Sequence, residues 1–359
     1  SSKIAGCLIA LTLVSLLASH VYVEYGVFEL KALLLGSALG VVFLNASFGF
    51  TTAWRRLLQE RRGLGIRAQM VMLAISVILF FPTLAAGELF GQSVSGFVRP
   101  LGFSVIVGAM MFGIGMQIAN GCASGNLFHL GKGQLRAIPI MAGFSAGALW
   151  ATSDYEWWTT QSQLAPVNLI ESFGPYVAII LNLVVLAMIF QFTRYIEHKR
   201  HGATETFKAD KTLPLLTRII QGPWPIIWGA IALALLNFAT LGLLGRPWVV
   251  ALAYPLWGAK AAEYFSLDLD IDFWTYWIQP GRDDALYNAL MQDPATLMNI
   301  GVIVGAFVAA TIAGKFSIQV KMPIQHWIGS VVGGVLLGYG ATIAYGCNIG
   351  AFIGGIVSG

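Results

Sequence analysis

The strongest constraint on this sequence is a series of apolar segments that carry almost no charge and recur along the whole chain. A helix needs about 20 apolar residues to cross a bilayer, and each segment comes close to that length. Only 11% of the 359 residues are charged, against roughly 25% in an ordinary soluble domain. The sequence therefore predicts an all-α polytopic membrane protein, with apolar segments at 4–23, 27–44, 68–87, 100–118, 137–152, 174–193, 224–243, 247–264, 297–314 and 326–345.

The charged residues are sorted between the connections. Lys and Arg gather in four of them, 55–67, 132–136, 194–218 and 315–321, which the positive-inside rule places in the cytoplasm. Asp and Glu gather at 154–171 and 268–293, which we expect outside. The net charge of +4 thus reflects membrane orientation, so membrane lipids are expected partners and nucleic acid is not.

Four polar, glycine-containing stretches interrupt the apolar pattern. Placing each of them as a break near mid-membrane makes the basic and acidic connections alternate correctly. Non-helical backbone at that depth persists only where protein or a water-lined cavity satisfies its polar groups. Broken helices or re-entrant loops around a central pore are therefore predicted, with the breaks at 45–52, 120–126, 237–247 and 345–350.

The second and fourth breaks belong to an internal repeat. Eight of the eighteen positions in 108–125 are identical to the residue 225 positions later. Under the charge assignment the two copies run in opposite directions, which is the inverted-repeat arrangement of transporters. We expect an extra N-terminal transmembrane helix at 1–26, a first repeat at 27–193, a basic cytoplasmic linker at 194–223, and a second repeat at 224–359 without its closing helix.

Each copy of the repeat contains a Gly-Cys-x-x-Gly motif, and the chain has only three cysteines, none of them in a CxxC pair. The inverted repeat would place Cys122 and Cys347 facing each other. Thiols suit a soft sulfur or selenium species and are less costly at mid-membrane than a full charge. The alternative is that these cysteines only pack helices, which is our interpretation of Cys7. The other candidate binding residues in the motifs are Gly121, Gly125, Gly346, Gly350, Asn120, Asn126 and Asn348.

An anionic substrate also needs hydrogen-bond donors. Backbone N–H groups after the breaks provide them, and Thr51 and Asn237 add side chains that equally serve as helix caps. Arg246 beside Pro247 is placed to attract anions, or else lies at the membrane interface. The acidic outer connections argue against a strong electrostatic funnel, so selectivity is expected at the constriction. The sequence has no P-loop and no HExxH motif, and we predict no catalytic residue, no metal and no cofactor.

The two Gly-Cys motifs resemble those of the YeeE/YedE sulfur-transport family, and the resemblance extends from about Leu30 onward. It implies a bacterial inner-membrane protein with an hourglass-like fold that takes up thiosulfate, or selenium compounds, through a relay of cysteines. Cys122 and Cys347 would be relay thiols. A cytoplasmic sulfur carrier of the TusA type is the implied partner.

This chain departs from that family at the first break, where Gly49 occupies the position of the usual cysteine. A two-thiol path or a substrate other than thiosulfate is then open. We predict a transporter, not an enzyme, that takes up an inorganic sulfur compound, thiosulfate first, through a cysteine-lined constriction. The alternatives are a selenium-compound transporter of the same fold and a membrane sulfurtransferase or thiol redox protein.

Overall fold

The computed structural model describes residues 2–207, 214–319 and 323–359, and it is almost entirely helical. Part of the predicted 194–223 linker, and Lys321 of the fourth basic connection, lie outside these residues. Eight helices of the described residues are long and apolar enough to cross a membrane, counting a helix together with the short one after its break in three cases. They are Gly6–Glu24, Val27–Glu60, Leu64–Ala86, Phe103–Gly131, Pro175–His201, Ile226–Leu244, Pro294–Ile312 and Ile324–Ile356. The chain is thus a multi-pass α-helical membrane protein.

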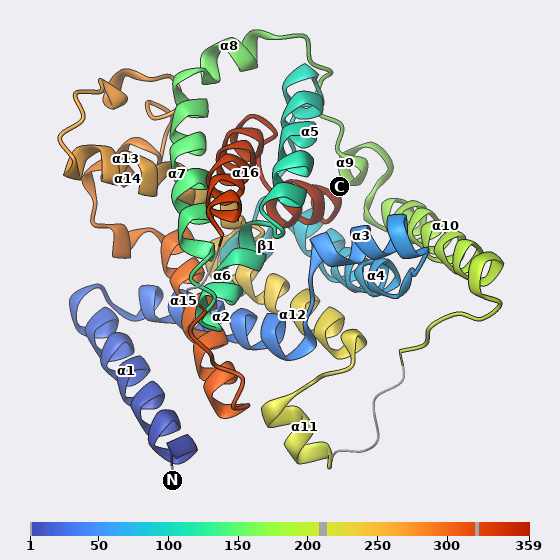
Figure 1. Ribbon diagram of the computed structural model, residues 1–359. Coiled ribbons are helices and arrows are strands. Elements are labelled where there is room, and N and C mark those ends of the chain that lie inside the picture. Colours follow the sequence, from blue (N-terminus) through green and yellow to red (C-terminus); the bar gives the residue numbers. More distant parts are fainter. Residues whose placement is uncertain (1, 208–213, 320–322) are drawn as a thin grey trace.

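Figure 1 shows α5, α6 and α16 near the centre of the molecule, with α1 apart at one edge. The α-helices are α1 (Ser2–Glu24), α2 (Val27–Ala46), α3 (Phe50–Glu60), α4 (Leu64–Ala86), α5 (Phe103–Ile118), α6 (Ala123–Gly131), α7 (Ala137–Ser153), α8 (Tyr155–Thr160), α9 (Leu169–Phe173), α10 (Pro175–His201), α11 (Leu215–Gln221), α12 (Ile226–Leu244), α13 (Ala253–Tyr264), α14 (Asp283–Tyr287), α15 (Pro294–Ile312), α16 (Ile324–Ile343) and α17 (Gly354–Ile356). The remaining elements are the strands β1 (Glu88–Leu89) and β2 (Gln92–Ser93), which form an antiparallel hairpin, and the short helices η1 (Val250–Leu252), η2 (Ile271–Phe273), η3 (Leu290–Gln292) and η4 (Asn348–Ile353).

All ten predicted apolar segments contain a helix, and three of the four breaks lie where the sequence placed them. The third break was misplaced. Helix α12 runs without interruption through Asn237 and ends at Gly245, which has the left-handed conformation (φ 70°) that glycine adopts without strain. As a result the predicted segment 247–264 holds only the short η1 and α13, which fall below a membrane span.

Helices α5 and α16 pack against each other antiparallel and reciprocally. A Cβ on Gly108 would lie 2.7 Å from the Gly340 carbonyl oxygen, and one on Gly115 would lie 2.8 Å from that of Gly333. Gly333 and Gly340 are the repeat counterparts of Gly108 and Gly115. Gly108 therefore contacts the counterpart of Gly115, and Gly115 contacts the counterpart of Gly108, as in a two-fold symmetric interface. The boundaries at 27–193 and 224–359 stay a prediction.

The basic connections meet at one end of the molecule, called here the basic side. As predicted from their charge, they lie together, because hydrogen bonds and an ion pair join them. These contacts are Arg67 to Glu197 (2.7 Å), Ser317 to Lys132 (3.2 Å) and Lys315 to Gln221 (3.5 Å). The acidic connections meet at the opposite end, the acidic side, where the Thr275 hydroxyl donates a hydrogen bond to Glu156 (2.9 Å).

Candidate functional site

Each Gly-Cys motif begins a short helix. Cys122 is the N-cap residue of α6 and Cys347 is that of η4, and both have an extended backbone. Immediately before them the chain turns through left-handed residues at equivalent positions, Asn120 (φ 55°) and Tyr345 (φ 60°). The same turn thus leads α5 into Cys122 and α16 into Cys347, so the two copies share local structure as well as sequence.

The Cys122 sulfur faces polar groups at the start of α6. It lies 3.5 Å from the Ser124 hydroxyl oxygen, and the backbone N–H groups of Ser124 and Gly125 are within hydrogen-bonding reach. The Asn126 amide donates to the Cys122 carbonyl oxygen (3.0 Å) and holds this turn in place. Because a helix N-terminus carries partial positive charge, this environment favours electron-rich sulfur and anions.

Cys347 has a matching environment. Its sulfur is within reach of the N–H groups of Ile349 and Gly350 and of a third from Ala251 in η1. Both thiols are almost fully buried, at 4% exposure each. The two sulfurs are within electrostatic range of each other; that they face each other, as the inverted repeat suggests, stays a prediction.

The glycines of the motifs allow close approach around the thiols. Gly346 has a φ of 152°, which residues with a side chain rarely adopt. A Cβ on Gly350 would come within 2.6 Å of a side chain from the third break, and one on Gly125 would contact the Cys122 sulfur at 3.4 Å. A Cβ on Gly121 would lie 3.0 Å from the Asn126 side-chain oxygen.

The three asparagines of the motifs have different roles. Asn120 accepts a hydrogen bond from Arg55 (2.6 Å) at the basic side, and Asn126 is occupied by the backbone of its own turn. The buried side-chain oxygen of Asn348 has no partner among the described residues. It lies with Cys347 in a groove of about 340 Å³ along α5. Asn348 is therefore the asparagine with capacity left to bind a solute.

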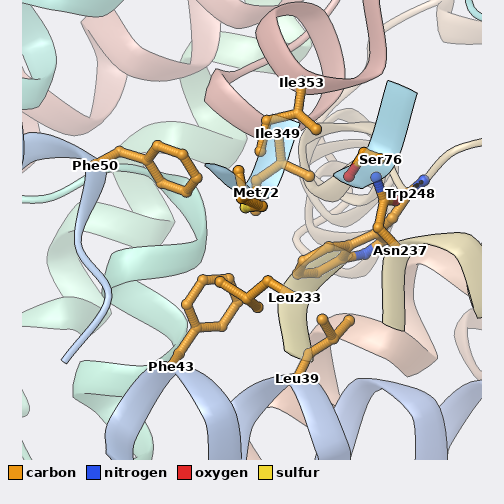
Figure 2. A pocket seen from close by; sticks show the side chains of 10 residues that line it. All are labelled: Leu39, Phe43, Phe50, Met72, Ser76, Leu233, Asn237, Trp248, Ile349 and Ile353. Carbon is orange, nitrogen blue, oxygen red and sulfur yellow. Dashed lines mark hydrogen bonds between the residues drawn. The ribbon is translucent and has the colours of Figure 1, made fainter. Parts of the chain in front are cut away.

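Figure 2 shows an apolar pocket at which the first, third and fourth breaks meet. Phe50 comes from the start of α3, Trp248 from the third break, and Ile349 from η4. The polar groups of Ser76 and the Trp248 indole are buried there without partners among the described residues. Ile349 and Ile353 of η4 line this pocket, whereas Asn348, Ala351 and Phe352 line the α5 groove.

The first break contributes less to the thiol site than predicted. Gly49 is the N-cap residue of α3, and a Cβ there would lie 3.3 Å from the Thr52 hydroxyl oxygen. Thr51 is buried, and its hydroxyl has no partner among the described residues. Both flank Phe50 of the Figure 2 pocket, and neither lines the α5 groove beside Cys347.

Three arginines surround two adjoining pockets on the acidic side, and they are called here the outer arginines (Arg99, Arg246 and Arg282). One pocket contains Arg99, Arg282 and Gly346, next to Cys347, and the other, of about 440 Å³, contains all three arginines. Asp293 is the one carboxylate that lines them in the described part of the chain.

The acidic outer connections had argued against attraction of anions, but the pocket that contains Gly346, the residue before Cys347, is basic. Burial lowers the pKa of Arg246, and the nearby Asp293 opposes this shift. Arg282 lies over the Tyr276 ring (3.9 Å to its centre) and Arg99 over Phe97 (4.6 Å). Most acidic residues of the outer connections do not line these pockets. The net charge of the connections therefore did not predict the charge of the pocket.

The sequence also gave no sign of Tyr254, a fully buried residue of α13. Its hydroxyl interacts electrostatically with both Cys122 and Cys347. Tyr254, Arg99 and Arg282 belong to none of the motifs found in the sequence, and only the folded chain shows where they lie. Cys7, by contrast, lies in the peripheral α1, which packs on α2 and α15.

The fold and the site define a multi-pass α-helical membrane protein with two buried thiols, each at a break between helices. A family model described as sulphur transport matches residues 45–359. The chain therefore belongs to the sulphur-transport family, in agreement with the resemblance of its Gly-Cys motifs.

Three curated relatives show how far the similarity extends. The thiosulfate transporter TsuA of Spirochaeta thermophila is 26% identical over 344 residues, which is 90% of each chain. The thiosulfate transporter TsuA of Escherichia coli is 22% identical over 338 residues, covering 89% of this chain and 85% of the relative. The probable transporter YedE of Escherichia coli is 26% identical over 133 residues, 37% of this chain and 32% of the relative.

Proposed function

We propose that this protein carries thiosulfate across the bacterial inner membrane into the cytoplasm, through a constriction formed by Cys122 and Cys347. The observation that supports the proposal is that two buried thiols each begin a short helix after a break, within reach of backbone N–H groups. The family and the two thiosulfate transporters similar over the chain's length support the substrate.

The charges suggest a path for a dianion. The outer arginines attract it on the acidic side and release it toward Gly346 and Cys347. Between the thiols, S–H groups donate hydrogen bonds to its terminal sulfur or oxygens, and N–H groups of η4 and α6 offset its charge. No covalent bond forms. Beyond Cys122 the anion meets Arg55 and Arg136, which donates to the Ala119 carbonyl oxygen (2.6 Å) on the basic side.

The basic side is then the cytoplasmic side, where a TusA-like sulfur carrier would take up the product of transport. The exposed basic residues of α10 and the connections offer a surface for an acidic partner. Direct binding of a purified TusA-like carrier to the reconstituted protein, with and without thiosulfate, tests this part of the proposal by itself.

The decisive experiment is uptake of radiolabelled thiosulfate into proteoliposomes that contain only this chain, with and without an imposed proton or sodium gradient. We expect Cys122→Ala and Cys347→Ala each to reduce uptake to background at normal reconstitution levels. Cys7→Ala is the matched control and should transport like the wild type, because α1 is peripheral. Full activity of either central variant would refute the relay.

Two measurements separate the rival functions. In the first, an excess of a selenium analogue is added during uptake of labelled thiosulfate, and an excess of thiosulfate during uptake of the selenium analogue. If the selenium analogue inhibits thiosulfate uptake but thiosulfate does not inhibit uptake of the selenium analogue, a selenium compound is the favoured cargo. A persulfide on Cys122 or Cys347 after exposure to thiosulfate, detected by mass spectrometry, would instead favour a membrane sulfurtransferase. Thiosulfate transport through hydrogen bonds alone predicts unmodified thiols after many turnovers.

A further inference from the structure

Tyr254 occupies a fixed position in the centre of the protein. Its side chain is fully buried (0% exposed), and its ring stacks on Phe144 of α7 with 4.0 Å between the ring centres. Trp257, one helical turn later, contacts the same ring at 4.8 Å. Aromatic contacts on two sides hold the ring, so the direction of its hydroxyl is set by packing.

The segment that carries Tyr254 touches both thiol helices. The preceding η1 contacts α6 and η4, and its Ala251 N–H group reaches the Cys347 sulfur. The Tyr254 hydroxyl is within electrostatic range of Cys122 as well as Cys347. Tyr254 comes two residues after η1, and its buried hydroxyl therefore lies in the same region of the core as the helices that begin at the thiols.

The hydroxyl of Tyr254 has no hydrogen-bond partner among the described residues. A buried hydroxyl without a partner destabilises a folded protein, and a phenol in a core normally finds one. Tyr339 shows the ordinary case, because its hydroxyl accepts from Trp158 (2.9 Å) and donates to Asp154 (2.8 Å). An unpartnered donor beside two thiols is explained if its partner is the solute.

We propose that Tyr254 donates a hydrogen bond from its hydroxyl to the substrate anion as the anion passes between Cys122 and Cys347. The inference rests on the proposed transport function and adds a third donor to the constriction. A phenol is a stronger hydrogen-bond donor than a thiol, and a dianion has only acceptors to offer.

The test is Tyr254→Phe, which keeps the stacked ring and removes only the donor. We expect the maximal rate of thiosulfate uptake to fall about tenfold, the size of one hydrogen bond to an anion. KM should stay within about twofold, because capture occurs at the outer arginines. The matched control is Tyr339→Phe, which removes a hydroxyl remote from the thiols and should leave the rate unchanged.

Three results would overturn the inference. Tyr254→Phe could transport at the wild-type rate, Tyr339→Phe could be equally slow, or the loss in Tyr254→Phe could appear only as a raised KM. Each is distinguishable from failure of the proposed function, in which the wild-type protein itself carries no thiosulfate. A Tm equal to that of the wild type shows that Tyr254→Phe is folded.

Discussion

At the scale of single residues, three arginines make the pockets on the acidic side basic. Arg99 lines both pockets of the outer arginines, and its guanidinium lies 5.9 Å from the centre of the Tyr345 ring, two residues before Cys347. No ion pair found among the described residues involves Arg99. Its charge is therefore available to an incoming anion.

We predict that Arg99→Gln raises KM for thiosulfate about tenfold and leaves the maximal rate within about twofold. A hydrogen bond to a charged group contributes about 1.5–3 kcal/mol, and 1.4 kcal/mol corresponds to a tenfold change in affinity. Uptake kinetics at several salt concentrations measure the effect, which should shrink as salt screens the charge. Lys199→Gln, an exposed change on the basic side, is the control. A KM equal in both variants would contradict the prediction.

At the scale of elements, glycines set how closely the central helices pack. Gly338 on α16 and its repeat counterpart Gly113 on α5 have opposite surroundings. A Cβ on Gly338 would overlap the carbonyl oxygen of Phe144 on α7, whereas nothing lies within 4 Å of a Cβ on Gly113. Helix α7 covers one face of the pair, and the equivalent face of α5 borders the groove beside Cys347.

This contrast predicts that Gly338→Ala destabilises the protein and Gly113→Ala does not, although the two changes are chemically identical. Overpacking a close helix contact costs about 1–3 kcal/mol, because α7 must move away from α16. Thermal unfolding of the purified protein in one detergent measures the difference. Equal Tm values for the two variants would show that the α7 to α16 contact is less tight than its geometry indicates.

Elements were predicted from the sequence more successfully than side-chain positions. Apolar length located all ten segments, and the repeated motif found both thiols, because each signal is local in the chain. Asn237 was assigned to a break, yet it lies within α12. Its side-chain oxygen accepts a hydrogen bond from the backbone N–H group of Trp248 (3.2 Å). The contacts of Tyr254 and Arg282 depend on helices distant in the sequence, and no local pattern encodes them.

At the scale of the whole molecule, the distribution of charge gives the protein two unlike ends. The basic side gathers the arginine-rich connections, with the buried pair of Arg67 and Glu197 joining α4 to α10. The acidic side carries most of the carboxylates and the pockets of the outer arginines. Positive connections remain in the cytoplasm during membrane insertion, so we predict that the outer arginines face the opposite compartment.

This orientation predicts which end of the protein a membrane-impermeant maleimide reaches in spheroplasts. Lys199 and Asp283 are both exposed, on the basic and acidic sides respectively. Asp283→Cys should be labelled in intact spheroplasts, and Lys199→Cys only after the membrane is permeabilised. Labelling of Lys199→Cys after permeabilisation shows that its thiol is reactive and is the control. Cys122 and Cys347 are buried and contribute little background, and the partly exposed Cys7 is replaced by alanine in both variants. The reverse labelling pattern would place the outer arginines in the cytoplasm, and thiosulfate would then meet them on leaving the constriction, which is incompatible with capture during uptake.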